Sequence, residues 1–152
     1  MALSPKREKR LQEVHMNAAG EYASMSYATR AQVGALIVKG DNILSYAWNG
    51  MPHGFPNDEL EYEEAGDLVT NPIGLHAESN ALMKLVASGE GSSTGADMYV
   101  TMSPCLDCAK LMIQAKIKRV FYRDAYRKTE SLDLLKRANI EVIQLPKASD
   151  HE

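Results

Sequence analysis

The sequence predicts an α/β fold in which helices cover both faces of a mixed five-stranded sheet. Short apolar runs typical of strands alternate with segments whose apolar residues recur at helical spacing. Only Gly40 and Asp41 separate the first two strand-like runs, which indicates an antiparallel hairpin, whereas helices separate the later runs, which favours parallel crossovers. The 152 residues suffice for one core and contain no repeat or linker, so we expect a single domain over residues 1–152.

The first part of the chain is predicted to form a helix and then the hairpin. Ser4 can cap a helix that extends to about Tyr27, and Pro5 suits its first turn. The apolar residues of this helix recur three or four positions apart: Leu11, Val14, Ala18, Tyr22 and Met25. The hairpin strands span 33–39 and 42–48.

A long acidic loop rich in glycine and proline follows at 49–75, and unstructured connections of this length are often functional. Ser103 is the expected N-cap of a later helix, with Pro104 as its first residue. Helices that follow strands place their N-termini along the carboxyl edge of the sheet, where open α/β folds bind ligands. The expected elements are a helix at 76–88, a loop at 89–95, a strand at 96–102, a helix at 104–116, a strand at 118–124, a helix at 131–139, a strand at 140–145 and a loose tail at 146–152.

Composition narrows the classes of function. Hydrophobic residues make up 45% and charged residues 24% of the chain, as in ordinary globular proteins. No apolar run approaches the roughly 20 residues that span a bilayer, and the N-terminus does not resemble a secretory signal, so we expect a cytoplasmic protein without a membrane partner. A net charge of −3 without a Lys/Arg block argues against a nucleic-acid partner but allows a single nucleotide.

The only two cysteines, Cys105 and Cys108, lie together at the start of the 104–116 helix. At this spacing they share one helical face, and the helix N-terminus lowers thiol pKa values. Two cysteines cannot build a disulfide framework. A redox pair, half of a metal site and a chance pairing remain, and the cysteines alone do not decide between redox and metal.

His53 in the 49–75 loop is one candidate for a further metal ligand, and His76 at the start of the 76–88 helix is another, with Glu78 two residues on. Successive helical residues turn by about 100°, so the side chains of His76 and Glu78 converge only at a helix end, with His76 at the cap. His76, Cys105 and Cys108 would give zinc three ligands and leave the fourth position for water, which is the catalytic arrangement, with Glu78 as the base. The alternatives are that His76 only caps the helix and that Glu78 is a first-turn acid that interacts favourably with the helix dipole.

"HAE" at 76–78 and "PCLDC" at 104–108 match the H-x-E…P-C-x-x-C signature of the zinc nucleoside and nucleotide deaminases. The helix–strand order also resembles the three-layer α/β/α sandwich of the cytidine deaminase fold. Within this superfamily the chain most resembles the deoxycytidylate (dCMP) deaminases. The likeness runs from about Arg30 to Pro146 and includes "RAQVGALIV", "WNGMPHG" and "HAESNAL".

This resemblance implies a zinc-dependent hydrolase that converts dCMP to dUMP and ammonia and so supplies pyrimidine deoxynucleotides for dTTP synthesis. A water activated by zinc would attack C4 of cytosine. Glu78 would take a proton from that water, donate it to N3 and pass another to the leaving amine. Backbone groups near Ala77 and Ser103 would read the cytosine edge.

The resemblance also suggests residues for the rest of the substrate. Asn49 matches an asparagine that contacts the sugar in relatives, although its plain reading is the turn residue of an Asn-Gly pair. Arg30 and Tyr126 resemble positions near the 5′-phosphate, and solvated surface residues are the alternative.

Regulation is implied as well: many dCMP deaminases are hexamers that dCTP activates and dTTP inhibits, with Mg²⁺ accompanying the triphosphate. The expected allosteric residues lie in one loop: Asn49, Gly50, Met51, His53, Gly54 and Phe55. Its glycines would let backbone amides approach phosphates, and an ordinary Pro/Gly loop is the alternative. The chain has Ala47-Trp48 where relatives usually have Gly-Tyr, and it lacks a second His/Cys set for a structural zinc.

Two competing functions remain. One is a deaminase that acts on a different cytosine, guanine or adenine substrate, either a free base or a base in tRNA. The other is a structural-zinc or redox module without hydrolytic chemistry.

Overall fold

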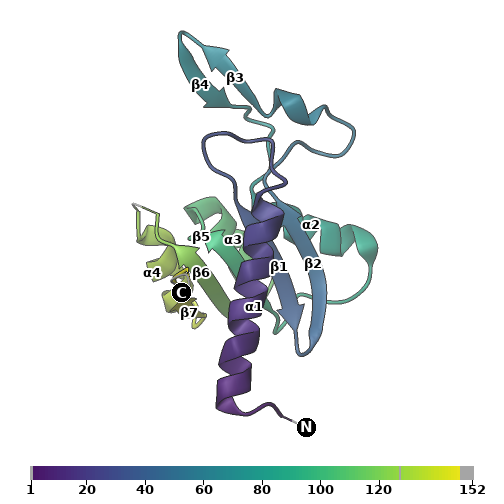
Figure 1. Cartoon of the computed structure of the whole chain (residues 1–152), viewed down its shortest axis with the longest axis vertical. Coiled ribbons are helices and arrows are strands. Elements are labelled where there is room, and N and C mark those ends of the chain that lie inside the picture. The colour runs from purple at the N-terminus through teal and green to yellow at the C-terminus, as the bar shows by residue number, and fades with distance from the viewer. Residues whose placement is uncertain (1, 127, 148–152) are drawn as a thin grey trace, which may run out of the picture.

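The computed structural model describes residues 2–126 and 128–147, and in it one five-stranded sheet lies between layers of helices (Figure 1). The strands lie in the order β2-β1-β5-β6-β7. The elements of the domain body are α1 (Pro5–Ala23), β1 (Gly34–Lys39), β2 (Asn42–Trp48), α2 (Ala77–Ser88), β5 (Asp97–Met102), α3 (Leu106–Gln114), β6 (Arg119–Asp124), α4 (Glu130–Arg137) and β7 (Glu141–Gln144). None of the described helices is long and apolar enough to cross a membrane.

The sheet is mixed. Strand β1 pairs antiparallel with both β2 and β5, while β5, β6 and β7 pair in parallel. Because β1 lies between β2 and β5, these two strands run in the same direction without touching, and α2 connects them. The predicted α/β class and the mixed five-stranded sheet are confirmed.

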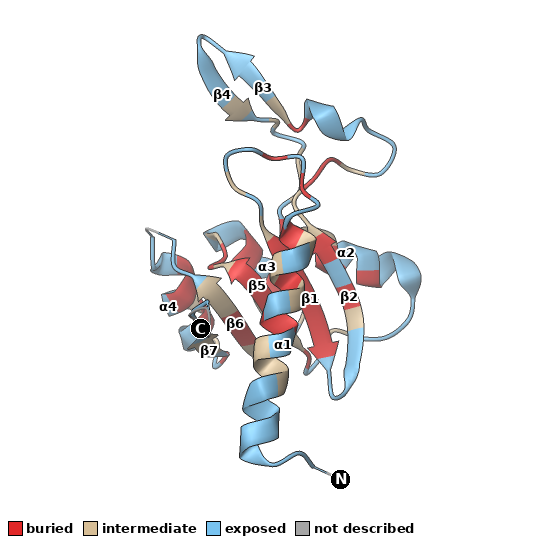
Figure 2. Ribbon diagram, viewed as in Figure 1, coloured by how far each residue is buried: buried red, intermediate tan, exposed pale blue. Residues whose placement is uncertain are grey.

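Helices cover both faces, which confirms the predicted three layers. Helix α1 packs against one face, where Leu36, Tyr99 and Phe121 are buried. Helices α2, α3 and α4 pack against the other face, where Ile37 and Met98 belong to the larger core. Figure 2 shows the buried residues concentrated in the sheet and along the helix surfaces that face it. Strand β1 faces a helical layer on each side, which explains its continuous apolar run.

The first helix ends earlier than predicted, at Ala23 instead of about Tyr27. Serine hydroxyls compete with the helix for backbone partners at this point. The hydroxyl of Ser24 donates to the carbonyl of Glu21 at 2.6 Å, and that of Ser26 donates to the carbonyl of Asn49 at 2.8 Å. These bonds turn the chain toward the carboxyl edge of the sheet.

The prediction of an unstructured loop at 49–75 was wrong. It contains a short 3-10 helix (η1, Asn57–Glu59) and a two-stranded antiparallel sheet of β3 (Glu61–Glu64) and β4 (Asp67–Thr70). Ala65 and Gly66 both have positive φ, as a two-residue hairpin turn with the correct twist requires. The hairpin projects from the body and is largely exposed (Figures 1 and 2), so its strands lack the apolar alternation that marks a buried strand.

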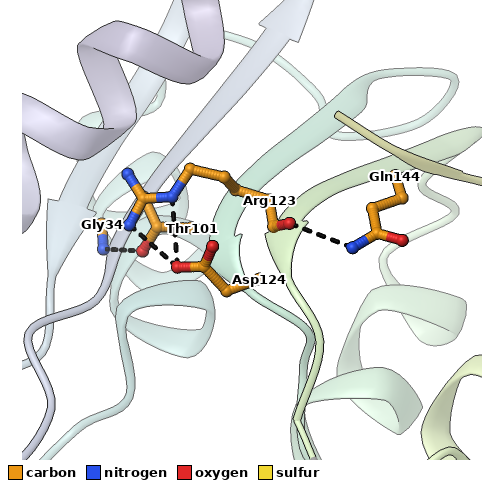
Figure 3. A network of polar contacts seen from close by, with 5 residues as sticks. All are labelled: Gly34, Thr101, Arg123, Asp124 and Gln144. Carbon is orange, nitrogen blue, oxygen red and sulfur yellow. Dashed lines mark hydrogen bonds and ion pairs between the residues drawn. The ribbon is translucent and has the colours of Figure 1, made fainter. Parts of the chain in front are cut away.

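Gly34 lies where α1 crosses the start of β1. A Cβ atom here would lie against the carbonyl oxygen of Ala19, far inside contact distance, and 2.8 Å from the amide nitrogen of Ala23. The Gly34 N–H donates to the hydroxyl of Thr101 at 3.1 Å, which fixes its position (Figure 3). The backbones of helix and strand therefore meet here with no room for a side chain.

Replacing Gly34 with alanine should lower the free energy of unfolding by about 2–3 kcal/mol, because backbone atoms cannot move aside as a flexible side chain can. The matched control is Gly20→Ala in α1, whose added Cβ meets only the guanidinium tip of Arg123, at 3.0 Å. That control should be neutral or stabilising by up to about 1 kcal/mol. Urea unfolding followed by tryptophan fluorescence measures both, and equal midpoints for Gly34→Ala and the wild type would contradict the packing described.

Candidate active site

The predicted metal ligands meet at the carboxyl edge of the sheet. His76 is the N-cap of α2, as predicted, and its Nδ1 lies 3.4 Å from the Sγ atoms of both Cys105 and Cys108. All three ligand atoms lie within 4.8 Å of one another. A tetrahedral zinc ion with ordinary bond lengths separates its sulfur and nitrogen ligands by about 3.5 Å, so the geometry fits a zinc ion.

Helix α3 begins later than predicted, and this changes the role of its first cysteine. Ser103 is not the cap and Pro104 is not the first residue: the helix starts at Leu106 with Cys105 as the N-cap. The Cys105 sulfur accepts a hydrogen bond from the Cys108 N–H at 3.4 Å, which replaces the expected serine oxygen. Both helices thus begin with a metal-ligand candidate, and both helix dipoles favour negative charge there.

The pKa values of the two thiols are shifted in opposite directions. Hydrogen bonds from Cys108 and His76 lower the pKa of Cys105 to about 4. The hydrogen bond to Cys105 and burial raise the pKa of Cys108. A bound divalent ion would favour ionisation of both thiols.

Glu78 lies beside these ligands in the first turn of α2 and is 4% exposed. Burial raises the pKa of its carboxyl group to about 7. A carboxyl group with a pKa near neutrality can both accept and donate a proton, which general acid–base catalysis requires. Glu78 is not part of the three-residue ligand set.

The site opens into a cavity of about 400 Å³. His76, Glu78 and Cys105 line this cavity. The predicted substrate residues line it as well: Arg30, Asn49, Ala77, Ser103 and Tyr126. Six further lining residues were not predicted: Ala28, Ala31, Val33, Glu61, Thr70 and Met102. Glu61 and Thr70 come from the hairpin, whose strands the sequence pattern did not reveal.

Asn49 braces one wall of the cavity. Its side-chain oxygen accepts from the Val33 N–H, and its amide group donates to the carbonyl of Ala31, both at 2.9 Å. Its side chain therefore ties the start of the sheet to the segment before it, which is a larger structural role than that of a turn residue.

Ser103 and Tyr126 also line the cavity. The Ser103 hydroxyl accepts from the Tyr126 N–H at 2.7 Å, and the Ser103 N–H donates to the carbonyl of Asp124 at 2.9 Å. Figure 3 shows the neighbouring contacts, in which Arg123 pairs with Asp124 and accepts from Gln144 through its carbonyl. These bonds hold the end of β6 beside the start of α3, and Tyr126 at the cavity.

The predicted allosteric loop is only partly connected to the site. Gly50 exchanges two backbone hydrogen bonds with Leu75, at 3.1 and 2.7 Å, directly before His76. Met51 is buried with Ala28 and Leu60. The remaining residues of that set are exposed, and none of them is among the residues that line the cavity: His53, Gly54 and Phe55.

Residues 9–124 match the family model described as the cytidine and deoxycytidylate deaminase zinc-binding region. The chain belongs to this family. The deaminase family membership predicted from the two motifs is therefore confirmed, and the metal-site geometry described above lies within the matched region.

Several deoxycytidylate deaminases resemble the chain in sequence. Deoxycytidylate deaminase from Homo sapiens is 40% identical over an alignment that covers 71% of this chain and 62% of the human protein. Deoxycytidylate deaminase from Enterobacteria phage T4 is 35% identical over 76% of this chain and 80% of the phage protein. The chain thus spans less than two thirds of the length of its human relative.

A solved structure extends the comparison to the fold. The crystal structure of dCMP deaminase from the cyanophage S-TIM5, in complex with dCMP and dUMP, is 38% identical with a TM-score of 0.82. The match covers 95% of this chain and 100% of that chain.

The donor set predicts that the purified protein binds one thiophilic divalent ion. Titration with Co²⁺ should produce thiolate-to-cobalt charge-transfer absorption that saturates near one equivalent. Cys108→Ser should lose most of this band because one sulfur ligand is removed, while Glu78→Gln should keep it because Glu78 lies outside the ligand set. A saturating band of normal intensity in Cys108→Ser would refute the ligand assignment.

Proposed function

We propose that this protein catalyses the zinc-dependent hydrolytic deamination of dCMP to dUMP and ammonia. The observation that supports this most is that one cavity is lined by the buried Glu78 and by His76 and Cys105, two members of the His/Cys/Cys ligand set. The cyanophage relative, whose crystal structure contains dCMP and dUMP, supports this choice of substrate.

Three residues would hold the zinc ion: His76 through Nδ1, and Cys105 and Cys108 through their sulfurs. When bound, zinc supplies a Lewis acid that lowers the pKa of water in its open position from 15.7 to about 7. Because two thiolates and a neutral imidazole balance the ionic charge, the acidifying effect is weaker than with three histidines. A neighbouring base therefore assists, and Glu78 is the candidate.

Glu78 would act as the general base and general acid of the reaction. Its carboxylate takes one proton from the attacking water and passes it to N3 as the bond from oxygen to C4 forms. It then passes the second proton of that water to the amine as the bond from C4 to nitrogen breaks, so that dCMP and water become dUMP and ammonia. Ala77 and Ser103 line the same cavity, and their backbone groups would orient the cytosine edge.

Other residues of the cavity suit the rest of the nucleotide. Asn49 also lines it and would contact the sugar, although its side chain already forms hydrogen bonds with Val33 and Ala31. Arg30 carries the positive charge that a 5′-phosphate requires, and Tyr126 lines the same cavity.

We also propose that the enzyme serves pyrimidine nucleotide biosynthesis in the cytoplasm as a homo-oligomer, the hexamer of related enzymes. In this proposal dCTP activates the enzyme and dTTP with Mg²⁺ inhibits it, through the loop that contains Asn49, Gly50, Met51, His53, Gly54 and Phe55. The Gly50–Leu75 backbone pair offers a physical route, because a shift of this loop would move the residue directly before His76.

Ammonia release distinguishes the proposed function from its competitors. The protein should release ammonia from dCMP and much less from deoxycytidine or cytosine. Glu78→Gln should reduce kcat by about 10²–10⁴-fold, the usual contribution of a general acid–base group, while retaining its metal and its thermal stability. Preference for a free base would favour another deaminase, and an inactive wild type that binds zinc would favour a structural module.

Regulation requires its own measurement. The rate of dCMP deamination should rise with dCTP and fall with dTTP and Mg²⁺ at subsaturating substrate. Gly54→Val should weaken both responses, because Gly54 has a φ of 89° and valine strains that backbone. Rates that are independent of both triphosphates would exclude the regulatory role.

A further inference from the structure

Both strands of the hairpin hold the segment that carries Arg30. From β3, one carboxylate oxygen of Glu61 accepts from the N–H of Thr29 at 2.6 Å and from its hydroxyl at 2.9 Å. The other oxygen accepts from the N–H of Arg30 at 3.1 Å. From β4, the carbonyl of Leu68 accepts from the Arg30 guanidinium at 3.2 Å.

Glu61 bonds to the backbone of Arg30 and does not form an ion pair with the guanidinium of Arg30. Among the described residues, no ion pair joins the Glu61 carboxylate to the Arg30 guanidinium. Partial desolvation opposes ionisation of Glu61, but the hydrogen bonds from Thr29 and Arg30, together with the positive charge of Arg30, hold its pKa below the usual range. The bonding carboxylate is therefore ionised near neutral pH, and the guanidinium stays available to an anion in the cavity.

We propose that Glu61 is a positioning residue that fixes Arg30 for the 5′-phosphate and so makes the β3–β4 hairpin part of substrate selection. This inference rests on the proposed function. Thr29 and Arg30 are exposed and outside any helix or strand, so their backbone needs an external partner to stay in one conformation. Fixing the segment before the substrate arrives reduces the conformational entropy lost on binding.

Glu61 could also act directly on the ligand, and this alternative predicts a change in dCMP binding of the opposite direction. Glu61 itself lines the cavity, so its negative charge would repel a phosphate if it acted directly on the ligand. Removal of that charge would then improve binding of dCMP. Positioning predicts weaker binding, so the two roles predict opposite results from one substitution.

Glu61→Gln is the informative variant because it keeps the shape of the side chain. The amide oxygen can still accept both bonds from Thr29, but the amide nitrogen then faces the N–H of Arg30 and cannot accept from it. Glu63→Gln is the matched control: Glu63 lies two residues along the same strand, is exposed, and forms no side-chain hydrogen bond or ion pair within the described ranges.

The readout compares ligands with and without the phosphate. For Glu61→Gln, we expect KM for dCMP to rise about tenfold with kcat nearly unchanged, the order expected when a hydrogen bond to a charged group is lost. The kcat/KM for deoxycytidine should change by less than about twofold. Calorimetric affinity for dUMP should fall by a similar factor, while affinity for deoxyuridine stays constant. Glu63→Gln should match the wild type throughout.

A double-mutant cycle tests whether Glu61 acts through Arg30. In an Arg30→Ala background, Glu61→Gln should have no further effect on dUMP affinity, because the group that it positions is gone. Additive losses would overturn the proposal, and so would tighter dUMP binding by Glu61→Gln or equal losses with deoxyuridine. The wild type alone tests the proposed function: failure to deaminate dCMP would reject that function, whereas the changes in dUMP affinity are measured without turnover.

Discussion

The candidate site depends on one geometric constraint, the meeting of two helix N-termini at the carboxyl edge of the sheet. His76 and Cys105 are both N-caps, with extended backbone that directs their side chains away from the helix and toward each other. In a helix interior, where each residue turns by about 100°, the side chain of His76 would point away from that of Glu78, two residues on. The order of strands in the sheet sets this meeting, because α2 precedes β5, α3 follows it, and both helices cover the same face.

Much of this arrangement could be predicted from the sequence. The buried strands carry strong apolar runs, and the two motifs contain the candidate ligands and the neighbouring carboxyl group. The precise start of α3 could not be predicted, because Ser103 and Pro104 form a conventional helix-start pair. The tertiary structure uses Ser103 to hold Tyr126 instead, and the cysteine sulfur takes over as the cap.

The hairpin was missed for a different reason. Its strands gain little from burial and are stabilised by the turn at Ala65 and Gly66, by backbone pairing and by the Glu61 contacts with a segment more than thirty residues earlier. Only the three-dimensional fold brings these parts together. Two cavity residues, Glu61 and Thr70, were therefore invisible to reasoning based on local periodicity. The contacts of Glu61 link a peripheral element to the ligand cavity without any contribution to the main core.

The turn at Ala65 and Gly66 also has a practical consequence. It lies at the end of the hairpin opposite Glu61 and Thr70, which are paired with each other at the base. A strand pair can grow at its tip in steps of two residues while the side chains at its base keep their facing. Substitutions or an engineered insertion at the tip should thus leave the pocket residues in place. A fluorescent label attached there would report on movements of the hairpin without occupying the pocket.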